Sequence, residues 1–144
     1  MTNNFVVPRS LLIEIGFNEN IKEYGHEDSL FGFELQSCGV EMLHIDNPAQ
    51  HIDLEPAQRF LNKTSKAVQN LWYLSKDYPM LYNIKLLRIF EKIRRYKLSF
   101  LITLADLMCS KSLIKNLLSN KPSLFAFDLY KLILLKRISK AEPN

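Results

Sequence analysis

The chain has few of the features that mark disulfide-stabilised or membrane-spanning proteins. Its 144 residues include two cysteines, Cys38 and Cys109, which form no Cys-x-x-Cys motif and have no histidine pair nearby. We therefore expect two free thiols in a reducing, cytoplasmic compartment. The longest apolar run, residues 98–108, is interrupted by serine, threonine and aspartate, whereas a spanning helix needs about 18–20 apolar residues. The first residues also lack the charged start and long apolar stretch of a signal peptide.

Several motifs that bind nucleotides or perform hydrolysis are missing too. The chain has no Gly-x-x-x-x-Gly-Lys-Ser/Thr, no Gly-x-Gly-x-x-Gly and no Gly-x-Ser-x-Gly, so the common phosphate-binding loops and the nucleophile elbow are not expected. It also has no Asp-x-Asp, the shortest arrangement that places two carboxylates on a divalent metal from one loop. What remains is a globular composition, with 47% apolar and 24% charged residues. Its length suits one domain or part of a larger one.

The net charge of +4 conceals an uneven distribution along the chain. Residues 1–78 contain six basic and eleven acidic residues, a net charge of −5. Residues 79–144 contain thirteen basic and four acidic residues, a net charge of +9. Such an asymmetry favours two parts with different roles. The acidic part suits carboxylate chemistry, and the basic part suits contact with phosphate, an anionic lipid surface or an acidic partner.

The first part, residues 1–54, has the pattern of a mixed helix and strand structure. Short apolar or alternating segments predict strands at residues 3–7 and 40–45. Pro8 and Gly16 are typical of the start and the end of a helix between them, over residues 9–15. A second helix is expected from Glu27 or Asp28 to residue 38, with Gly39 at its end. We therefore predict an α+β fold.

The second part, residues 55–144, has the pattern of a mainly helical extension. Asp53 can cap a helix that begins at Leu54, and apolar residues recur in it at helical spacing from residue 57 to residue 72. The break at residues 77–79 ends it. Further helices are expected at residues 81–96, 101–107, 112–118 and 124–138, with a turn at residues 120–122. The boundary between the two parts rests on helix content and charge alone.

Two places in the first part have residue types that carry chemistry. Glu27 and Asp28 follow Gly25 and precede an apolar helical stretch, so their carboxylates lie at a helix N-terminus, which stabilises the ionised form. Such a carboxylate can accept a proton from a substrate hydroxyl, or it can simply cap the helix. His51 follows a strand in a polar loop, where an imidazole can bind a metal ion or stand in solvent.

The order of several short motifs resembles a known enzyme family. The segments are Thr2-Asn3-Asn4-Phe5, Pro8-Arg9, Ile15-Gly16-Phe17-Asn18-Glu19, Tyr24-Gly25-His26-Glu27-Asp28, Phe31-Gly32-Phe33-Glu34-Leu35, Gly39 and His51. This order is similar to the C-terminal half of the catalytic domain of family 2 glycosyltransferases, which have the GT-A fold, and to the galactosyltransferase C-terminal region. The resemblance covers about residues 2–55.

The resemblance implies a role for five residues. Asp28 matches the catalytic base, and Glu27 would contact the acceptor or donor sugar. Asn4 would lie in an inner strand and turn near the donor sugar, and Gly25 would line the substrate site. His51 matches a histidine that binds the divalent metal, Mn²⁺ or Mg²⁺, on the nucleotide diphosphate. The reaction would transfer a sugar from a nucleotide sugar to a glycan or lipid-linked hydroxyl.

The family's nucleotide-binding half, with its Asp-x-Asp metal site, has no counterpart in these 144 residues. We therefore expect the chain alone to be inactive and to bind the metal weakly or not at all, with an N-terminal half supplied by another chain or by a longer protein. An alternative is a non-enzymatic helical remnant or interaction module.

The basic stripe is a further candidate for binding. It comprises Lys85, Arg88, Lys92, Arg94, Arg95 and Lys97. It suits peripheral contact with an anionic membrane at its inner face, or it is a solvated helix face. Nucleic acid is not an expected partner, because the aromatic residues are spaced as core residues.

Overall fold

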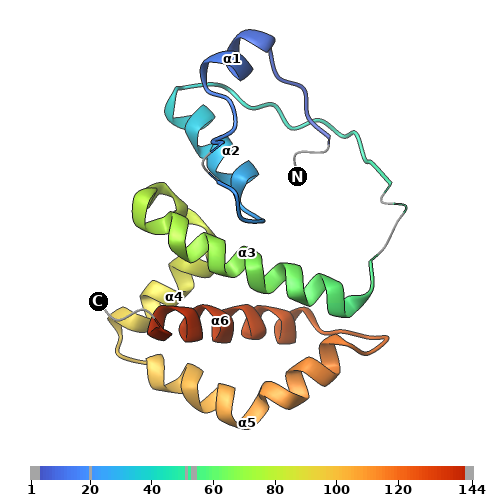
Figure 1. Cartoon of the computed structure of the whole chain (residues 1–144), viewed down its shortest axis with the longest axis vertical. Coiled ribbons are helices and arrows are strands. Elements are labelled where there is room, and N and C mark those ends of the chain that lie inside the picture. The colour runs from blue at the N-terminus through green and yellow to red at the C-terminus, as the bar shows by residue number, and fades with distance from the viewer. Residues whose placement is uncertain (1–3, 20, 51, 53–54, 142–144) are drawn as a thin grey trace.

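The computed structural model describes residues 4–19, 21–50, 52 and 55–141. In these residues the regular elements are α1 (Arg9–Glu14), α2 (Glu27–Ser37), α3 (Ala57–Asp77), the 3-10 helix η1 (Pro79–Asn83), α4 (Lys85–Arg95), α5 (Ser99–Leu117) and α6 (Leu124–Ala141). Figure 1 shows α3 to α6 stacked together, with α1 and α2 lying against one side of the stack. A long loop runs from α2 to α3 around the outside.

The predicted α+β, GT-A-like fold is wrong, because the described residues are helices and loops without a strand. Residues 4–7 and 40–45, the described parts of the two expected strands, form no ladder with each other. The Val40 amide instead donates to the Leu35 carbonyl and so completes the end of α2. Val6 is 99% exposed. A short β-branched segment becomes a strand only when a partner pairs with its backbone groups, and neither segment has such a partner among the described residues.

The helical second half is confirmed, with three differences in its boundaries. The one helix expected at residues 81–96 is divided into η1 and α4. The two short helices expected around residues 101–118 are one helix, α5, which is bent near its middle (Figure 1). Within it the Ser110 hydroxyl lies 2.6 Å from the Asp106 carbonyl oxygen, a side-chain contact that often bends a helix without ending it. Helix α3 begins at Ala57, after Pro56, whereas the expected start at Leu54 and the expected cap Asp53 lie outside the described residues.

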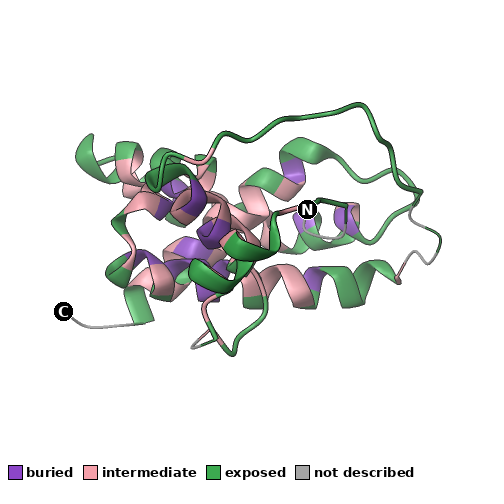
Figure 2. Ribbon diagram, turned by 90° about the horizontal axis from the view of Figure 1, so that it is seen from above, coloured by how far each residue is buried: buried purple, intermediate pink, exposed green. Residues whose placement is uncertain are grey.

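Helix α6 is the centre of the helical stack. It packs against α3, α4 and α5, and its Ile133 and Leu135 are buried in the main apolar cluster. In the same cluster Trp72 of α3 meets Phe90 of α4 edge to face, with the ring centres 6.0 Å apart. Figure 2 shows the buried residues gathered between the helices, while the loop from α2 to α3 is exposed along nearly its whole length.

The first part of the chain is joined to this stack by apolar and polar contacts. Leu30 of α2 is fully buried and belongs to the same cluster as the helices of the second half. The Asn18 side-chain amide donates to the Tyr78 hydroxyl at 2.5 Å. Phe5 and Phe17 both pack against Phe31 of α2, with ring centres 6.4 and 4.5 Å from it. The division at residues 1–54 and 55–144 stays a prediction.

None of the helices in the described part of the chain has the length and apolar character needed to cross a membrane.

Candidate functional site

The candidate site is a tight turn at residues 23–28, here called the acidic turn, which leads into α2. Gly25 and His26 both have left-handed backbones, with φ of 104° and 71°. Glycine adopts such a conformation at no steric cost, and histidine is among the residues that tolerate it best. The two residues reverse the chain so that α2 begins at Glu27, with Glu27 and Asp28 in its first turn.

A buried asparagine of α3 fixes the acidic turn in place. The side-chain amide nitrogen of Asn70 donates to the Glu23 carbonyl at 3.1 Å and to the Gly25 carbonyl at 2.5 Å. Asn70 is only 6% exposed, so these bonds satisfy polar groups that water does not easily reach. The turn also lies directly on the helix backbone, because a Cβ on Gly25 would come within 2.6 Å of the Ala67 Cβ.

The carboxylates of the acidic turn differ in exposure. Glu27 is exposed and Asp28 is half-buried. Asp28 Oδ1 accepts the backbone N–H of Ser29 at 2.8 Å, which satisfies one of the free amides at the start of α2. Asp28 Oδ2 has no hydrogen-bond partner among the described residues. One carboxylate oxygen is therefore held in position while the other is free to accept a proton.

His26 brings a titratable ring to the same turn. Burial lowers the pKa of His26 below its usual 6.5, and the charges of Asp28 and Glu27 oppose this only in part. Its Nδ1 lies 3.4 Å from the Ser29 hydroxyl oxygen. The ring is therefore neutral at pH 7 and adds no positive charge beside the two carboxylates.

The other predicted site residues are not gathered at the acidic turn. The Asn4 side-chain amide donates to the Asn47 carbonyl at 2.6 Å, which ties the start of the chain to the long loop, and the strand expected around it is absent. Gly25 is in the turn, but its tight contact with Ala67 gives it a packing role, and contact with a substrate stays a prediction. His51 lies outside the described residues. Among the described residues no group of three or more His, Cys, Asp or Glu side chains could hold a metal ion.

Asn70 and Ala67 are the residues of this site that sequence reasoning missed. Asn70 lies 45 residues after Gly25, and its role follows from a long-range contact. The only local signal is a polar residue between the apolar Val68 and Leu71 in a helical pattern. Such a residue is equally typical of the edge of a buried face.

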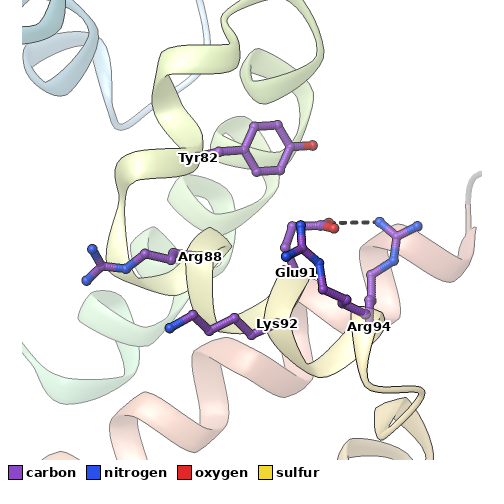
Figure 3. Close-up of a pocket in the computed structure, with 6 residues that line it drawn as sticks. Tyr82, Arg88, Glu91, Lys92 and Arg94 are labelled. Carbon is purple, nitrogen blue, oxygen red and sulfur yellow. Dashed lines mark hydrogen bonds and ion pairs between the residues drawn. The ribbon is translucent and has the colours of Figure 1, made fainter.

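A second feature is an open hollow of about 500 Å³ beside α4, lined by Tyr82, Arg88, Glu91, Lys92, Arg94 and Arg95. Figure 3 shows that the basic side chains do not converge, because Arg88 and Lys92 point to one side while Arg94 pairs with Glu91. Lys85 also has a partner, Asp128, at 3.9 Å. Two of the six residues of the basic stripe are thus paired with carboxylates. The basic side chains that line the hollow point apart (Figure 3), so they do not form a common binding site for one anion.

Comparisons with known protein families, with curated protein sequences and with solved structures find no match to this chain.

The packing of Gly25 gives a first prediction, with Gly32 as its matched control. Gly25→Ala should lower the free energy of unfolding by about 2–5 kcal/mol, since it adds backbone strain and a clash with Ala67. Gly32 lies inside α2 with open space around it. Gly32→Ala should therefore raise the free energy of unfolding by roughly 0.5–1 kcal/mol. Urea unfolding followed by circular dichroism measures both, and equal effects at the two glycines would contradict the observed contact.

The buried imidazole gives a second prediction. Because the pKa of His26 is lowered in the fold, the unfolded chain binds a proton below about pH 6.5 that the folded chain does not. The free energy of unfolding should therefore fall as the pH is lowered from 7.5 to 5.5. His26→Asn keeps a residue that tolerates the left-handed backbone and should reduce this fall.

The control for this measurement is His44→Asn, which changes an exposed loop histidine. Urea unfolding at the two pH values should give the same pH dependence for this variant as for the wild type. If His26→Asn also leaves the pH dependence unchanged, His26 is not buried as described.

Proposed function

We propose that the acidic turn supplies the general base for glycosyl transfer to a hydroxyl acceptor. The observation that carries this proposal is the state of Asp28, whose Oδ1 is held by the Ser29 amide while Oδ2 has no hydrogen-bond partner in the part of the chain that the structure describes. The half-buried carboxylate lies on a turn fixed to α3 by Asn70. A base that is positioned before the reaction is an efficient proton acceptor, because no reorganisation is needed in the transition state.

The proposed chemistry is a direct displacement at the anomeric carbon of a nucleotide sugar. The acceptor hydroxyl oxygen forms a bond to that carbon, its proton passes to Asp28 Oδ2, and the bond to the nucleoside diphosphate breaks. Glu27 is adjacent and exposed, which suits hydrogen bonds to sugar hydroxyls. The neutral ring of His26 leaves Asp28 without a buried cation beside it that would weaken it as a base. The acceptor is a glycan or a lipid-linked saccharide in this proposal.

The donor side is proposed to come from another polypeptide segment or chain. A divalent Mn²⁺ or Mg²⁺ would neutralise the leaving diphosphate when bound there. Such ions prefer several hard oxygen ligands, and the described residues offer no such cluster. His51 alone would add one nitrogen ligand, so the isolated chain should bind the ion weakly. The proposed location is the cytoplasm, where the free thiols of Cys38 and Cys109 would stay reduced.

The alternative proposal is a helical interaction module without catalysis. It is supported by the same contact, since Asp28 Oδ1 stabilises the start of α2 whatever else the residue does. In that case Asp28 would contribute to the stability of the fold and would have no catalytic role. The two proposals therefore differ in what a change at Asp28 does to turnover.

The proposal predicts that Asp28→Asn removes activity while leaving the fold intact. The chain alone should show no sugar transfer. In an enzyme completed with a nucleotide-binding half, Asp28→Asn should lower kcat about 100-fold or more, the usual contribution of a general base. The asparagine Oδ1 still accepts the Ser29 amide, so the free energy of unfolding should change by less than about 1 kcal/mol. The measurement is kcat for the completed enzyme, beside urea unfolding.

The matched control is Asp77→Asn, which makes the same chemical change at an exposed position at the end of α3. It should leave kcat unchanged. Wild-type turnover in Asp28→Asn would show that the carboxylate is only a helix-stabilising group, which is the interaction-module alternative.

A further inference from the structure

One face of α5 is apolar and has no partner in the described part of the chain. Five large side chains on this face, here called the α5 face, are exposed: Phe100, Leu101, Leu104, Leu107 and Met108. Their spacing of three and four residues places them on one side of the helix. Leu107 and Met108 are 82% and 74% exposed, so core packing does not explain them. Apolar patches of this kind commonly mark interaction surfaces.

The opposite side of α5 is attached to the helical stack, so the α5 face is directed outward. Ile102, Leu113 and Leu117 are buried, and α6 is the main neighbour of the helix. Arg137 of α6 holds the Asp106 carboxylate through two hydrogen bonds, of 2.8 Å from Nε and 2.5 Å from a terminal nitrogen. Figure 1 shows α5 at the outer edge of the stack. The contacts on the inner side of α5 therefore fix the orientation of the helix and direct the α5 face toward the outside.

The charged residues that α5 itself places on the side of the α5 face are both lysines. Lys111 and Lys115 continue the same side of the helix toward its C-terminal end, and Arg95 and Lys97 precede its start. These four residues are exposed and form no ion pair within the described residues. Asp106 is the acidic residue of α5, and Arg137 neutralises it on the other side of the helix. The exposed apolar strip on α5 is therefore continued by two lysines that have no ion pair among the described residues, and α5 itself adds no carboxylate on that side.

We propose that the α5 face docks on the surface of an anionic lipid bilayer. Helices that lie in a membrane interface combine Phe and Leu on one side with Lys and Arg next to them, so that apolar side chains enter the headgroup boundary while the cations meet lipid phosphates. The positive charge of the lysines beside the α5 face favours binding to an anionic bilayer over a neutral one. This surface shares Arg95 and Lys97 with the basic stripe, but its apolar residues and its two lysines belong to α5, whereas Lys85 and Arg94 of the stripe are paired. The proposal does not depend on the acidic turn.

The test is sedimentation of the full chain with vesicles of phosphatidylcholine containing 30% phosphatidylglycerol, at 0.1 M salt. Leu107→Gln with Met108→Gln should weaken binding about tenfold or more, because two exposed apolar side chains no longer enter the interface. Lys111→Gln with Lys115→Gln should weaken it about tenfold as well, and vesicles of phosphatidylcholine alone should bind far less. Raising the salt to 1 M should weaken the wild type.

The matched control is Leu43→Gln with Ile45→Gln, which removes two apolar side chains that are 85% and 71% exposed in the long loop. It should bind vesicles as the wild type does. Equal binding by the wild type and the Leu107→Gln, Met108→Gln variant would overturn the proposal. The proposal would also be overturned if the wild type did not bind vesicles but formed dimers, and if the Leu107→Gln, Met108→Gln variant did not form them. The α5 face would then be a contact between two copies of the chain.

Discussion

The bonds from Asn70 to the Glu23 and Gly25 carbonyls are the contacts on which the rest of the site depends. A buried amide that loses its partners costs about 1–3 kcal/mol, so the turn and α3 constrain each other. With the turn held there, Gly25 must approach Ala67 closely, and the left-handed backbone of His26 starts α2 at Glu27. The orientation of the proposed base thus follows from a side chain on another helix.

The same arrangement places the two carboxylates of the acidic turn at the edge of the core. Leu30, two residues after Asp28, is fully buried in the central cluster. The carboxylates stay at the edge, where the free amides of the helix start and the solvent both stabilise their charge. In the basic second half, the acidic residue of α5 is the one that is paired, because Asp106 binds Arg137 of α6. The apolar face of α5 and its lysines are exposed instead. The acidic turn and the α5 face are thus two separate surfaces, one in each part of the chain.

The sequence predicted the helices better than the strands for physical reasons. Helical periodicity is local, so α3, α4 and α6 are found close to their expected positions. Residues 3–7 and 40–45 had strand-like composition, but a strand depends on a partner that local pattern cannot supply, and the α+β prediction failed there. Two short helices were expected at residues 101–107 and 112–118, yet the residues between them lie inside the single helix α5, where the Ser110 hydroxyl contacts the Asp106 carbonyl. The acidic turn was located from Gly25, Glu27 and Asp28, whereas Asn70 was missed because its partners are 45 and 47 residues away.

Hydrogen exchange at the Leu30 amide tests most directly whether Asn70 holds the acidic turn. That amide donates to the His26 carbonyl and is the first backbone bond of α2. Asn70→Asp keeps the shape of the side chain but turns a donor into an acceptor facing two carbonyls. Asn62→Asp makes the same change on α3 at an exposed residue. The account predicts faster exchange of the Leu30 amide in Asn70→Asp, with protection retained in α6 and in Asn62→Asp. Equal protection of Leu30 in all three proteins would contradict it.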